Sequence, residues 1–205
     1  RAVVDYAHNR LSFERLFDSI YLEYPGWRIN LELEPETFDS VKVWVPDTYR
    51  EFQQFLAKED GRLIEFTNPT YSQPYCYNIS GESLIRQFSY GMNLLRVHFP
   101  TLSFHTYAVE EPCFTSALPQ ILRLFGFRYA VLKNPDTCYG GYMVAYGDDL
   151  VNWIGPDNTQ MLTIPRYSVE KLEDNSTWQT TAWNNSSKYL NACKEGGIAY
   201  PIGMC

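Results

Sequence analysis

The stretch SFHTYAVEEPCFTSALPQILRLFGFRYAVL, residues 103–132, decides the fold of this chain. Its first seven residues, 103–109, are predicted to form a strand. Residues 116–125 are predicted to form a helix that ends at Gly126, and residues 127–132 a second strand. A strand, a helix and a strand within 30 residues make a βαβ crossover, so we expect the two strands to be parallel.

The sequence on either side of this unit continues the alternation of strands and helices. The further elements predicted are helix 3–24, strand 27–33, helix 48–58, strand 62–67, helix 80–98, strand 161–164 and helical structure around 180–194. Such alternation favours an α/β architecture with a mainly parallel sheet, either a barrel or an open sheet. In these folds the chemistry takes place at the carboxyl ends of the strands, which directs attention to the loops over residues 34–39, 68–79 and 110–115.

Length and composition restrict the class of protein. The 205 residues are 45% hydrophobic and 20% charged, which suits one globular domain, or a large fragment of one, and excludes a disordered chain. No run of 18 apolar residues is present to span a membrane. The net charge is −7, and no stretch of the sequence is strongly basic. Neither nucleic acid nor an anionic membrane surface is therefore an expected partner. Aromatic residues make up 16% of the chain, with Tyr the commonest of them, and such rings pack in cores or stack on sugars.

The cysteines and histidines give little support for a metal site made wholly within this chain. The five cysteines form no CxxC pair, and the three histidines form no HxxxH or HxH motif. Cys113 follows a strand and is either a nucleophile or a structural thiol. The chain begins at Arg1 without an initiator Met, and we expect it to be a piece of a longer polypeptide.

Carboxylates at predicted strand ends are the strongest signal of chemistry. Glu32 and Glu34 end one strand, and Glu110 and Glu111 end another. Two carboxyl groups that face each other across a cleft serve as nucleophile or base and as acid in glycoside hydrolysis. The alternative is that they are solvated acids of surface loops.

Three segments resemble the family 38 glycoside hydrolases, the retaining α-mannosidases. Residues 78–88, NISGESLIRQF, resemble the family's SGESLVRQ helix start, and residues 108–122, AVEEPCFTSALPQIL, resemble its PDSFGYSAALPQIL stretch. Residues 152–164, NWIGPDNTQMLTI, are similar to the strand pair that contains FWWKGPDGS. With GRLIEF at 61–66, the motifs keep the family's order, and the resemblance covers roughly residues 2–165.

The resemblance implies a (β/α)7 barrel of the glycoside hydrolase and deacetylase type. It implies that residues 1–205 are part of a single catalytic barrel domain, incomplete at both ends. It further implies a Zn²⁺ ion that binds sugar hydroxyls and is held by an Asp that is also the nucleophile. Glu110 stands at the position of that Asp, and the remaining zinc ligands are expected before Arg1 and after Cys205.

The function implied by the resemblance is hydrolysis of glycosidic bonds by an α-mannosidase-like retaining enzyme. Glu110 is the candidate nucleophile and metal ligand, and Tyr75, Tyr71, Glu34 and Trp153 are the candidate substrate-binding residues. Glu110 in place of Asp, and Tyr75 in place of an acidic residue, also suit a non-catalytic carbohydrate-binding relic. A deacetylase-type hydrolase on the same barrel is a further alternative.

The resemblance also sets the expected partners and location. The partners are a carbohydrate substrate and further domains of the same polypeptide. The location is extracellular or periplasmic.

Overall fold

The computed structural model describes residues 29–57, 64–109, 114–132, 146–147, 149–170, 187–199 and 201. The predicted helix over 3–24 lies outside these residues. The chain divides into two compact units, which are described separately. The first unit comprises residues 1–73 and 81–104, and the second comprises residues 74–80 and 105–205.

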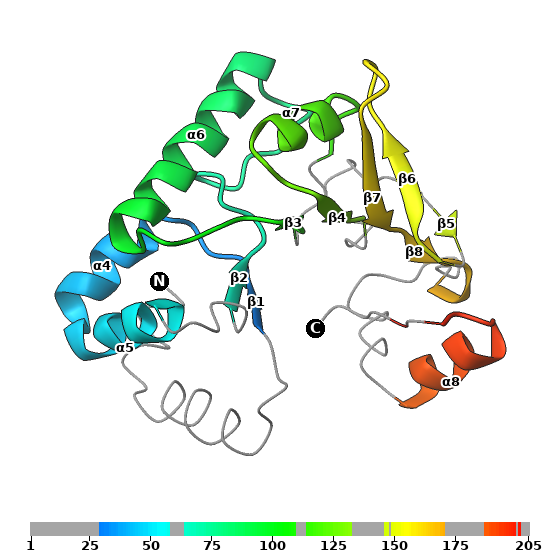
Figure 1. Ribbon diagram of the computed structural model, residues 1–205, viewed down its shortest axis with the longest axis horizontal. Helices are drawn as coiled ribbons and strands as arrows, with labels where there is room; N and C mark the ends of the chain where they lie inside the picture. The colour runs from blue at the N-terminus through cyan, green and yellow to red at the C-terminus, as the bar shows by residue number, and fades with distance from the viewer. Residues whose placement is uncertain are drawn as a thin grey trace. The chain divides into compact units, whose positions relative to one another are not determined.

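The first unit is built on a parallel pair of short strands (Figure 1). In β1 (Ile29–Leu31) and β2 (Ile64–Phe66), the last residues, Leu31 and Phe66, lie opposite each other. The chain between the strands forms α4 (Thr37–Trp44) and α5 (Pro46–Ala57), and the long α6 (Gly81–His98) follows β2. Helices between parallel strands are the crossover connection that parallel pairing requires. The predicted strands 27–33 and 62–67 and helices 48–58 and 80–98 are thereby confirmed in type.

The helix α4 was not predicted from the sequence, which indicated a loop over residues 34–39. A turn at Pro35–Glu36, closed by the Thr37 N–H donating to the Glu34 carbonyl over 2.9 Å, leads into the helix. Three of its eight residues are β-branched, and such residues have modest helix propensity. Burial of Phe38 and Val41 on one face supplies the stabilisation that propensity lacks.

Aromatic rings form the core of the first unit. The Phe38 ring packs edge-on against Phe99 with 4.9 Å between centroids, and against Phe66 with 5.7 Å. Helix α6 contributes an apolar face at helical spacing, and its buried residues are Leu84, Phe88, Gly91, Met92, Leu95 and His98. Five of these are apolar or lack a side chain, and the sixth is a histidine that closes the face at the helix end.

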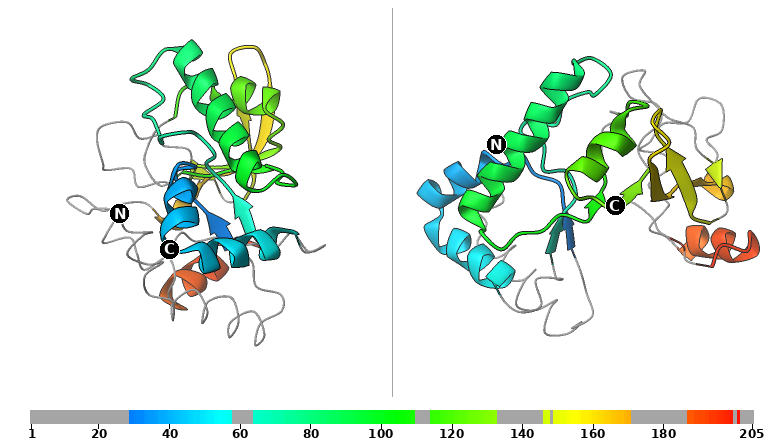
Figure 2. Two further views of the ribbon diagram at one scale, coloured as in Figure 1. Left: turned by 90° about the vertical axis from the view of Figure 1, so that its left-hand side faces the viewer. Right: turned by 45° about the horizontal axis from the view of Figure 1, so that its top comes forward.

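The second unit contains a four-stranded sheet with the order β3-β4-β7-β6. Strands β3 (Thr106–Tyr107) and β4 (Tyr129–Val131) are parallel and are joined by α7 (Leu118–Leu124), which confirms the predicted βαβ unit over residues 103–132. Strand β7 (Gln160–Ile164) continues the parallel pairing from β4, and β6 (Val151–Ile154) forms an antiparallel hairpin with β7 (Figure 2).

A smaller cluster follows in the same unit. Strand β5 (Tyr146–Gly147) pairs in parallel with β8 (Arg166–Tyr167), and η2 (Ser168–Glu170) continues the chain. Helix α8 (Ser187–Glu195) buries Tyr189 and Cys193 against Tyr167 and Ile198. The predicted helical structure around 180–194 is confirmed where it is described.

The α/β class is confirmed. Four of the five strand pairings among the described residues are parallel, and the β6–β7 hairpin is antiparallel. The closed seven-stranded barrel stays a prediction. Among the described helices none is long and apolar enough to cross a membrane.

Candidate functional site

A polar pair lies at the carboxyl end of the parallel strands of the first unit. Glu32 directly follows β1, and Asn68 follows Thr67 at the end of β2. The Thr67 N–H donates to the Leu31 carbonyl over 3.0 Å, which extends the strand pairing by one residue beyond β2. The pairing brings the ends of the two strands together, and the Asn68 Nδ2 donates a 2.9 Å hydrogen bond to Glu32 Oε1. Two residues 36 positions apart in sequence therefore meet at the strand edge.

The side chain of Thr70 fixes the orientation of the Asn68 amide. Asn68 Oδ1 accepts a hydrogen bond from the Thr70 hydroxyl over 2.8 Å and a longer one, 3.4 Å, from the Thr70 N–H. Asn68 is 2% exposed and Thr70 is 1% exposed. Because two donors occupy the amide oxygen, the amide nitrogen is the atom that faces Glu32. Hydrogen bonds thus link the half-buried Glu32 carboxylate to the buried side chains of Asn68 and Thr70.

The loop that carries Asn68 is fastened to α6. The Tyr71 N–H donates to the Gln87 carbonyl over 3.0 Å, and the Ser72 N–H donates to Gln87 Oε1 over 2.9 Å. Gln87 Nε2 donates in return to the Ser72 hydroxyl oxygen over 3.0 Å. A Cβ atom at Gly91 would lie 2.0 Å from the Pro69 carbonyl oxygen, so the loop crosses α6 at a place where only glycine fits.

Two of the predicted substrate-binding residues lie in the loops after these strands. Glu34 is half-buried in the loop between β1 and α4. Tyr71 is 39% exposed in the loop between β2 and α6, where its backbone is held on Gln87. Parallel pairing sends both loops out from the same edge of the strand pair. The phenol ring of Tyr71 is the exposed aromatic surface of this region.

The other predicted substrate-binding residues belong to the second unit. Tyr75 is half-buried, and its ring lies 5.9 Å from that of the exposed Tyr77. Trp153 on β6 is 8% exposed and packs edge-on against Phe114, with 5.6 Å between ring centroids. Most of the Trp153 indole is therefore covered. Glu110, the candidate nucleophile and metal ligand, lies outside the described residues, as does Cys113.

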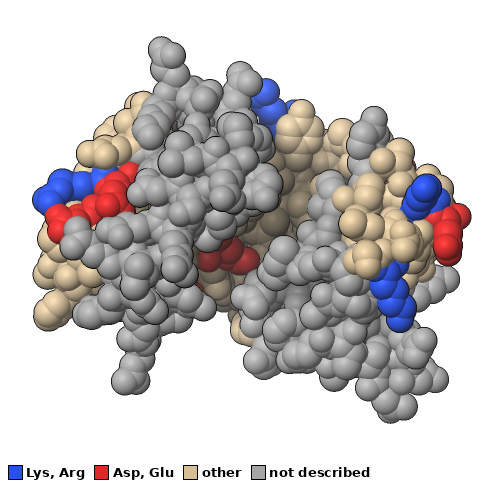
Figure 3. Space-filling view, turned by 90° about the horizontal axis from the view of Figure 1, so that it is seen from below, with Lys and Arg blue, Asp and Glu red and all other residues tan. Residues whose placement is uncertain are grey.

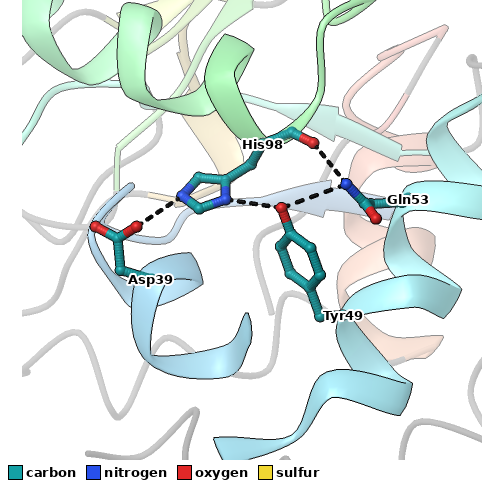
Figure 4. Close-up of polar contacts among 4 residues, drawn as sticks. All are labelled: Asp39, Tyr49, Gln53 and His98. Carbon is teal, nitrogen blue, oxygen red and sulfur yellow. Dashed lines mark hydrogen bonds and ion pairs between the residues drawn. The ribbon is translucent and has the colours of Figure 1, made fainter. Parts of the chain in front are cut away.

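A second polar cluster joins three helices of the first unit at His98 (Figure 4). His98 Nδ1 lies 2.9 Å from the Tyr49 hydroxyl of α5, and its Nε2 lies 3.2 Å from Asp39 Oδ1 of α4. The Asp39 contact is not aligned as a hydrogen bond, so its contribution is electrostatic. Gln53 Nε2 donates to the His98 carbonyl over 3.1 Å and to the Tyr49 hydroxyl over 3.3 Å.

The electrostatics of this cluster favour its neutral groups. Burial lowers the pKa of His98, Asp39 opposes that shift, and Lys42 adds to it. Burial also raises the pKa of Tyr49, and the Asp39 charge raises it further. The neutral imidazole with its proton on Nε2 faces Asp39 and leaves Nδ1 to accept from the Tyr49 hydroxyl. His98 is 2% exposed, so the cluster connects helices and is not placed to touch a ligand.

Sequence reasoning missed the partners in both clusters. One signal was available for His98, because it continues the buried face of α6 at the spacing set by Leu84, Phe88 and Leu95. A histidine at such a position needs a polar partner. The Asn68–Glu32 contact had no equivalent signal, since it depends on the register between two strands.

Metal-ligating and charged side chains of the described residues also bear on the function of this region. No three His, Cys, Asp or Glu side chains among them lie close enough together to hold an ion. This part of the chain therefore does not supply a zinc site by itself. On the face shown in Figure 3, described acidic and basic side chains stand beside each other at both margins, and no extended basic patch gathers among them.

Comparison with known proteins gave one family match and several similar folds. Residues 34–196 match the model of the glycosyl hydrolases family 38 N-terminal domain. A search of curated proteins found no match. A 4-alpha-glucanotransferase from Thermococcus litoralis is similar in structure with a TM-score of 0.57 and 14% identity, over 81% of this chain and 25% of that one.

A protein in glycosyl hydrolase family 38 from Enterococcus faecalis is similar with a TM-score of 0.50 and 15% identity, over 93% of this chain and 20% of that one. At these identities the likeness concerns the fold alone. The chain spans a quarter of the first structure's length and a fifth of the second's.

Proposed function

The chain belongs to glycosyl hydrolase family 38, whose N-terminal domain it matches over residues 34–196, and from this premise we propose that it takes part in hydrolysis of glycosidic bonds. The family match is the observation that carries the proposal. The polar edge at Glu32 and Asn68 supports it, because α/β folds bind ligands where the parallel strands end. We propose an α-mannosidase-like, retaining reaction on glycans or polysaccharides.

In this proposal Glu110 is the nucleophile. A retaining glycosidase uses one carboxylate to form a covalent glycosyl–enzyme intermediate, and a second carboxyl group protonates the leaving oxygen and then activates water. Glu110 directly follows the predicted strand 103–109 in the sequence, and residues 106–107 of that stretch form β3.

Substrate contacts are proposed for four residues. The exposed ring of Tyr71 offers a face for stacking on a sugar, and Tyr75 offers a hydroxyl group at its phenol edge. The Glu34 carboxylate would accept hydrogen bonds from sugar hydroxyls. Trp153 is largely covered by Phe114, so its proposed contact is limited to the exposed part of the indole.

We also propose that Glu110 is one ligand of a Zn²⁺ ion, and this proposal rests on the family resemblance. Zinc is usually held by three or four protein ligands, and the described residues bring no such set together. A bound zinc would act as a Lewis acid toward sugar hydroxyls.

The test uses the full-length protein and a panel of aryl α- and β-glycosides that includes the α-mannoside. Glu110→Gln is expected to lower kcat on the order of 10⁴-fold, because a carboxamide is a far poorer nucleophile. Glu82→Gln is the matched control, because Glu82 is an exposed carboxylate of α6 that contacts Arg86, and we expect its activity to stay near that of the wild type. Normal hydrolysis by Glu110→Gln would exclude Glu110 as nucleophile. Sugar binding without turnover by the wild type would favour the non-catalytic alternative.

A further inference from the structure

The four-stranded sheet of the second unit has one buried face and one exposed, largely apolar face (Figure 1). The buried face holds Ala130, Met161 and Thr163. The exposed face holds Tyr129 of β4, Leu162 of β7 and Ile154 of β6, which are 48%, 40% and 55% exposed. We propose that this face is an interaction surface and that a segment of the same polypeptide, outside residues 1–205, covers it.

The apolar side chains of the exposed face adjoin one another. Tyr129 and Leu162 are direct partners in the parallel pairing of β4 with β7. Ile154 lies opposite Gln160 in the hairpin and is therefore a diagonal neighbour of Leu162. Single exposed apolar residues are ordinary on a protein surface, whereas three that adjoin on one sheet face form a patch. The strand positions that share this face are all uncharged, and they are Thr106, Tyr129, Val131, Asn152, Ile154, Gln160, Leu162 and Ile164.

The parallel pairing explains why this face needs a cover. Strands β3, β4 and β7 run parallel to one another. Parallel sheets occur almost only in proteins that cover both faces, and their strands are apolar on both sides. A sheet face that is meant for solvent carries polar residues at alternate positions, but β4 and β7 place Tyr129 and Leu162 there. The exposed face therefore has the composition of a buried one.

The chain itself begins the cover at one end of this face. Ile164, the last residue of β7, packs against the buried cluster of α8. Ile164 and its strand partner Val131 are half-buried, whereas Leu162 and Tyr129, two residues earlier in each strand, are exposed. Among the described residues, the covering layer thus stops between these two rows. A further segment would continue the same layer.

Length and charge favour the same polypeptide over a second copy as the occupant. This chain covers 25% of the similar glucanotransferase and 20% of the similar family 38 protein. Segments of one long polypeptide meet at effective concentrations on the order of millimolar, which favours their contact without new interactions. A second copy would instead bring together two chains of net charge −7. The occupant is expected to present an apolar side, since a buried charge would find no charged partner on these strands.

The test places a photoreactive side chain on the exposed face of the full-length protein. In one variant p-benzoylphenylalanine replaces Tyr129, and in a second it replaces Leu162. In the matched control it replaces Leu124, which is 77% exposed at the end of α7. After irradiation and digestion, mass spectrometry identifies the peptide that is joined to each position. The first two variants are expected to join to a peptide outside residues 1–205 of the same molecule, and the control is expected to give far less product.

The other cross-linking outcomes overturn the proposal. A product joined to a peptide within residues 1–205, a product with the mass of two chains, or no product at all would each exclude the proposed occupant. Denaturing electrophoresis separates the cross-linked monomer from a dimer. The replacement of Tyr129 keeps an aromatic ring and decides the question where thermal melting shows that the Leu162 variant does not fold. Neither measurement depends on glycosidase activity.

Thermal melting of charged variants is an independent test of the cover. Leu162→Lys is expected to lower the Tm of the full-length protein by about 5 °C or more, because a covered ammonium group loses its hydration. Leu124→Lys is the matched control and should leave the Tm nearly unchanged. Equal melting temperatures of Leu162→Lys and the wild type would show that nothing covers the face and would overturn the proposal.

Discussion

The hydroxyl group of Tyr49 on α5 lies 2.9 Å from Nδ1 of His98, the last residue of α6. Both residues are buried, and Gln53 bonds to the Tyr49 hydroxyl and to the His98 backbone. The two residues are 49 positions apart in the sequence, and their contact joins α5 to α6. In the neutral imidazole, Nδ1 accepts the hydrogen bond from the Tyr49 hydroxyl. In the protonated imidazole, Nδ1 would carry a proton that points at this same hydroxyl group.

The free energy of unfolding is therefore expected to fall in mild acid. In the unfolded chain the pKa of His98 is about 6.5. In the folded chain burial lowers this pKa, Asp39 opposes the shift and Lys42 adds to it. Below about pH 6.5 the unfolded chain therefore binds the proton more readily than the folded chain, so the free energy of unfolding decreases as the pH falls toward the folded-state pKa. Urea unfolding between pH 5 and 7.5 measures the effect.

The His98→Gln variant is the control for that prediction. It is expected to be less stable at pH 7.5 than the wild type and to lose less stability on acidification. A variant with the same pH dependence as the wild type would show that other groups account for it.

Removing the Tyr49 hydroxyl is expected to destabilise the first unit. Tyr49→Phe leaves the Nδ1 atom of the buried His98 without its donor, and such losses cost about 1–3 kcal/mol. Tyr90→Phe on α6 is the matched control, because Tyr90 is exposed and its hydroxyl contacts only the surface of the helix at Arg86. Equal unfolding midpoints for the two variants would contradict a stabilising role for the Tyr49–His98 contact.

The α/β crossover over residues 103–132 was predictable because its signals are local. A strand, a helix that ends at Gly126 and a second strand follow one another within a short stretch, and parallel pairing then follows from chain geometry. The helix α4 was not predicted, because Thr37, Val41 and Val43 favour strands locally and packing of Phe38 decides the matter.

The candidate site was predictable only in part, for a related reason. The position of Glu32 at a strand end could be derived from alternation of apolar and polar residues. Its partner Asn68 could not, because the contact depends on Leu31 lying opposite Phe66 in a pairing of distant strands. The same holds for Tyr49 and His98, whose contact depends on how α5 and α6 pack.

Substitution of Gly91 is expected to disrupt the contact between α6 and the loop after β2. A Cβ atom there would lie 2.0 Å from the Pro69 carbonyl oxygen and 2.7 Å from the Tyr71 nitrogen, both backbone atoms that cannot yield cheaply. Gly91→Ala should therefore cost about 1–3 kcal/mol or more, despite the better helix propensity of alanine.

Gly81→Ala is the matched control for Gly91→Ala, since no atom lies within 4 Å of a Cβ at that position and its φ is not positive. We expect it to leave stability unchanged or to raise it by about 0.4–1 kcal/mol. Thermal unfolding of both variants checks the contrast. A stable Gly91→Ala protein would mean that the loop does not cross α6 as closely as described.

The two aromatic candidates for sugar contact should respond differently to truncation. Tyr71 is 39% exposed and lies outside the buried core, so Tyr71→Ala should weaken sugar binding measurably while stability changes little. Trp153 is 8% exposed and packs against Phe114, so Trp153→Ala should cost about 3–5 kcal/mol of stability. Sugar titrations and urea unfolding of the same preparations separate the two effects.

Trp153→Phe retains an aromatic ring against Phe114 and should recover much of the stability. If Trp153→Phe were as stable as the wild type yet bound sugar far more weakly, the exposed part of the indole would be a genuine contact. If Tyr71→Ala bound sugar normally, the loop after β2 would lose its proposed stacking surface.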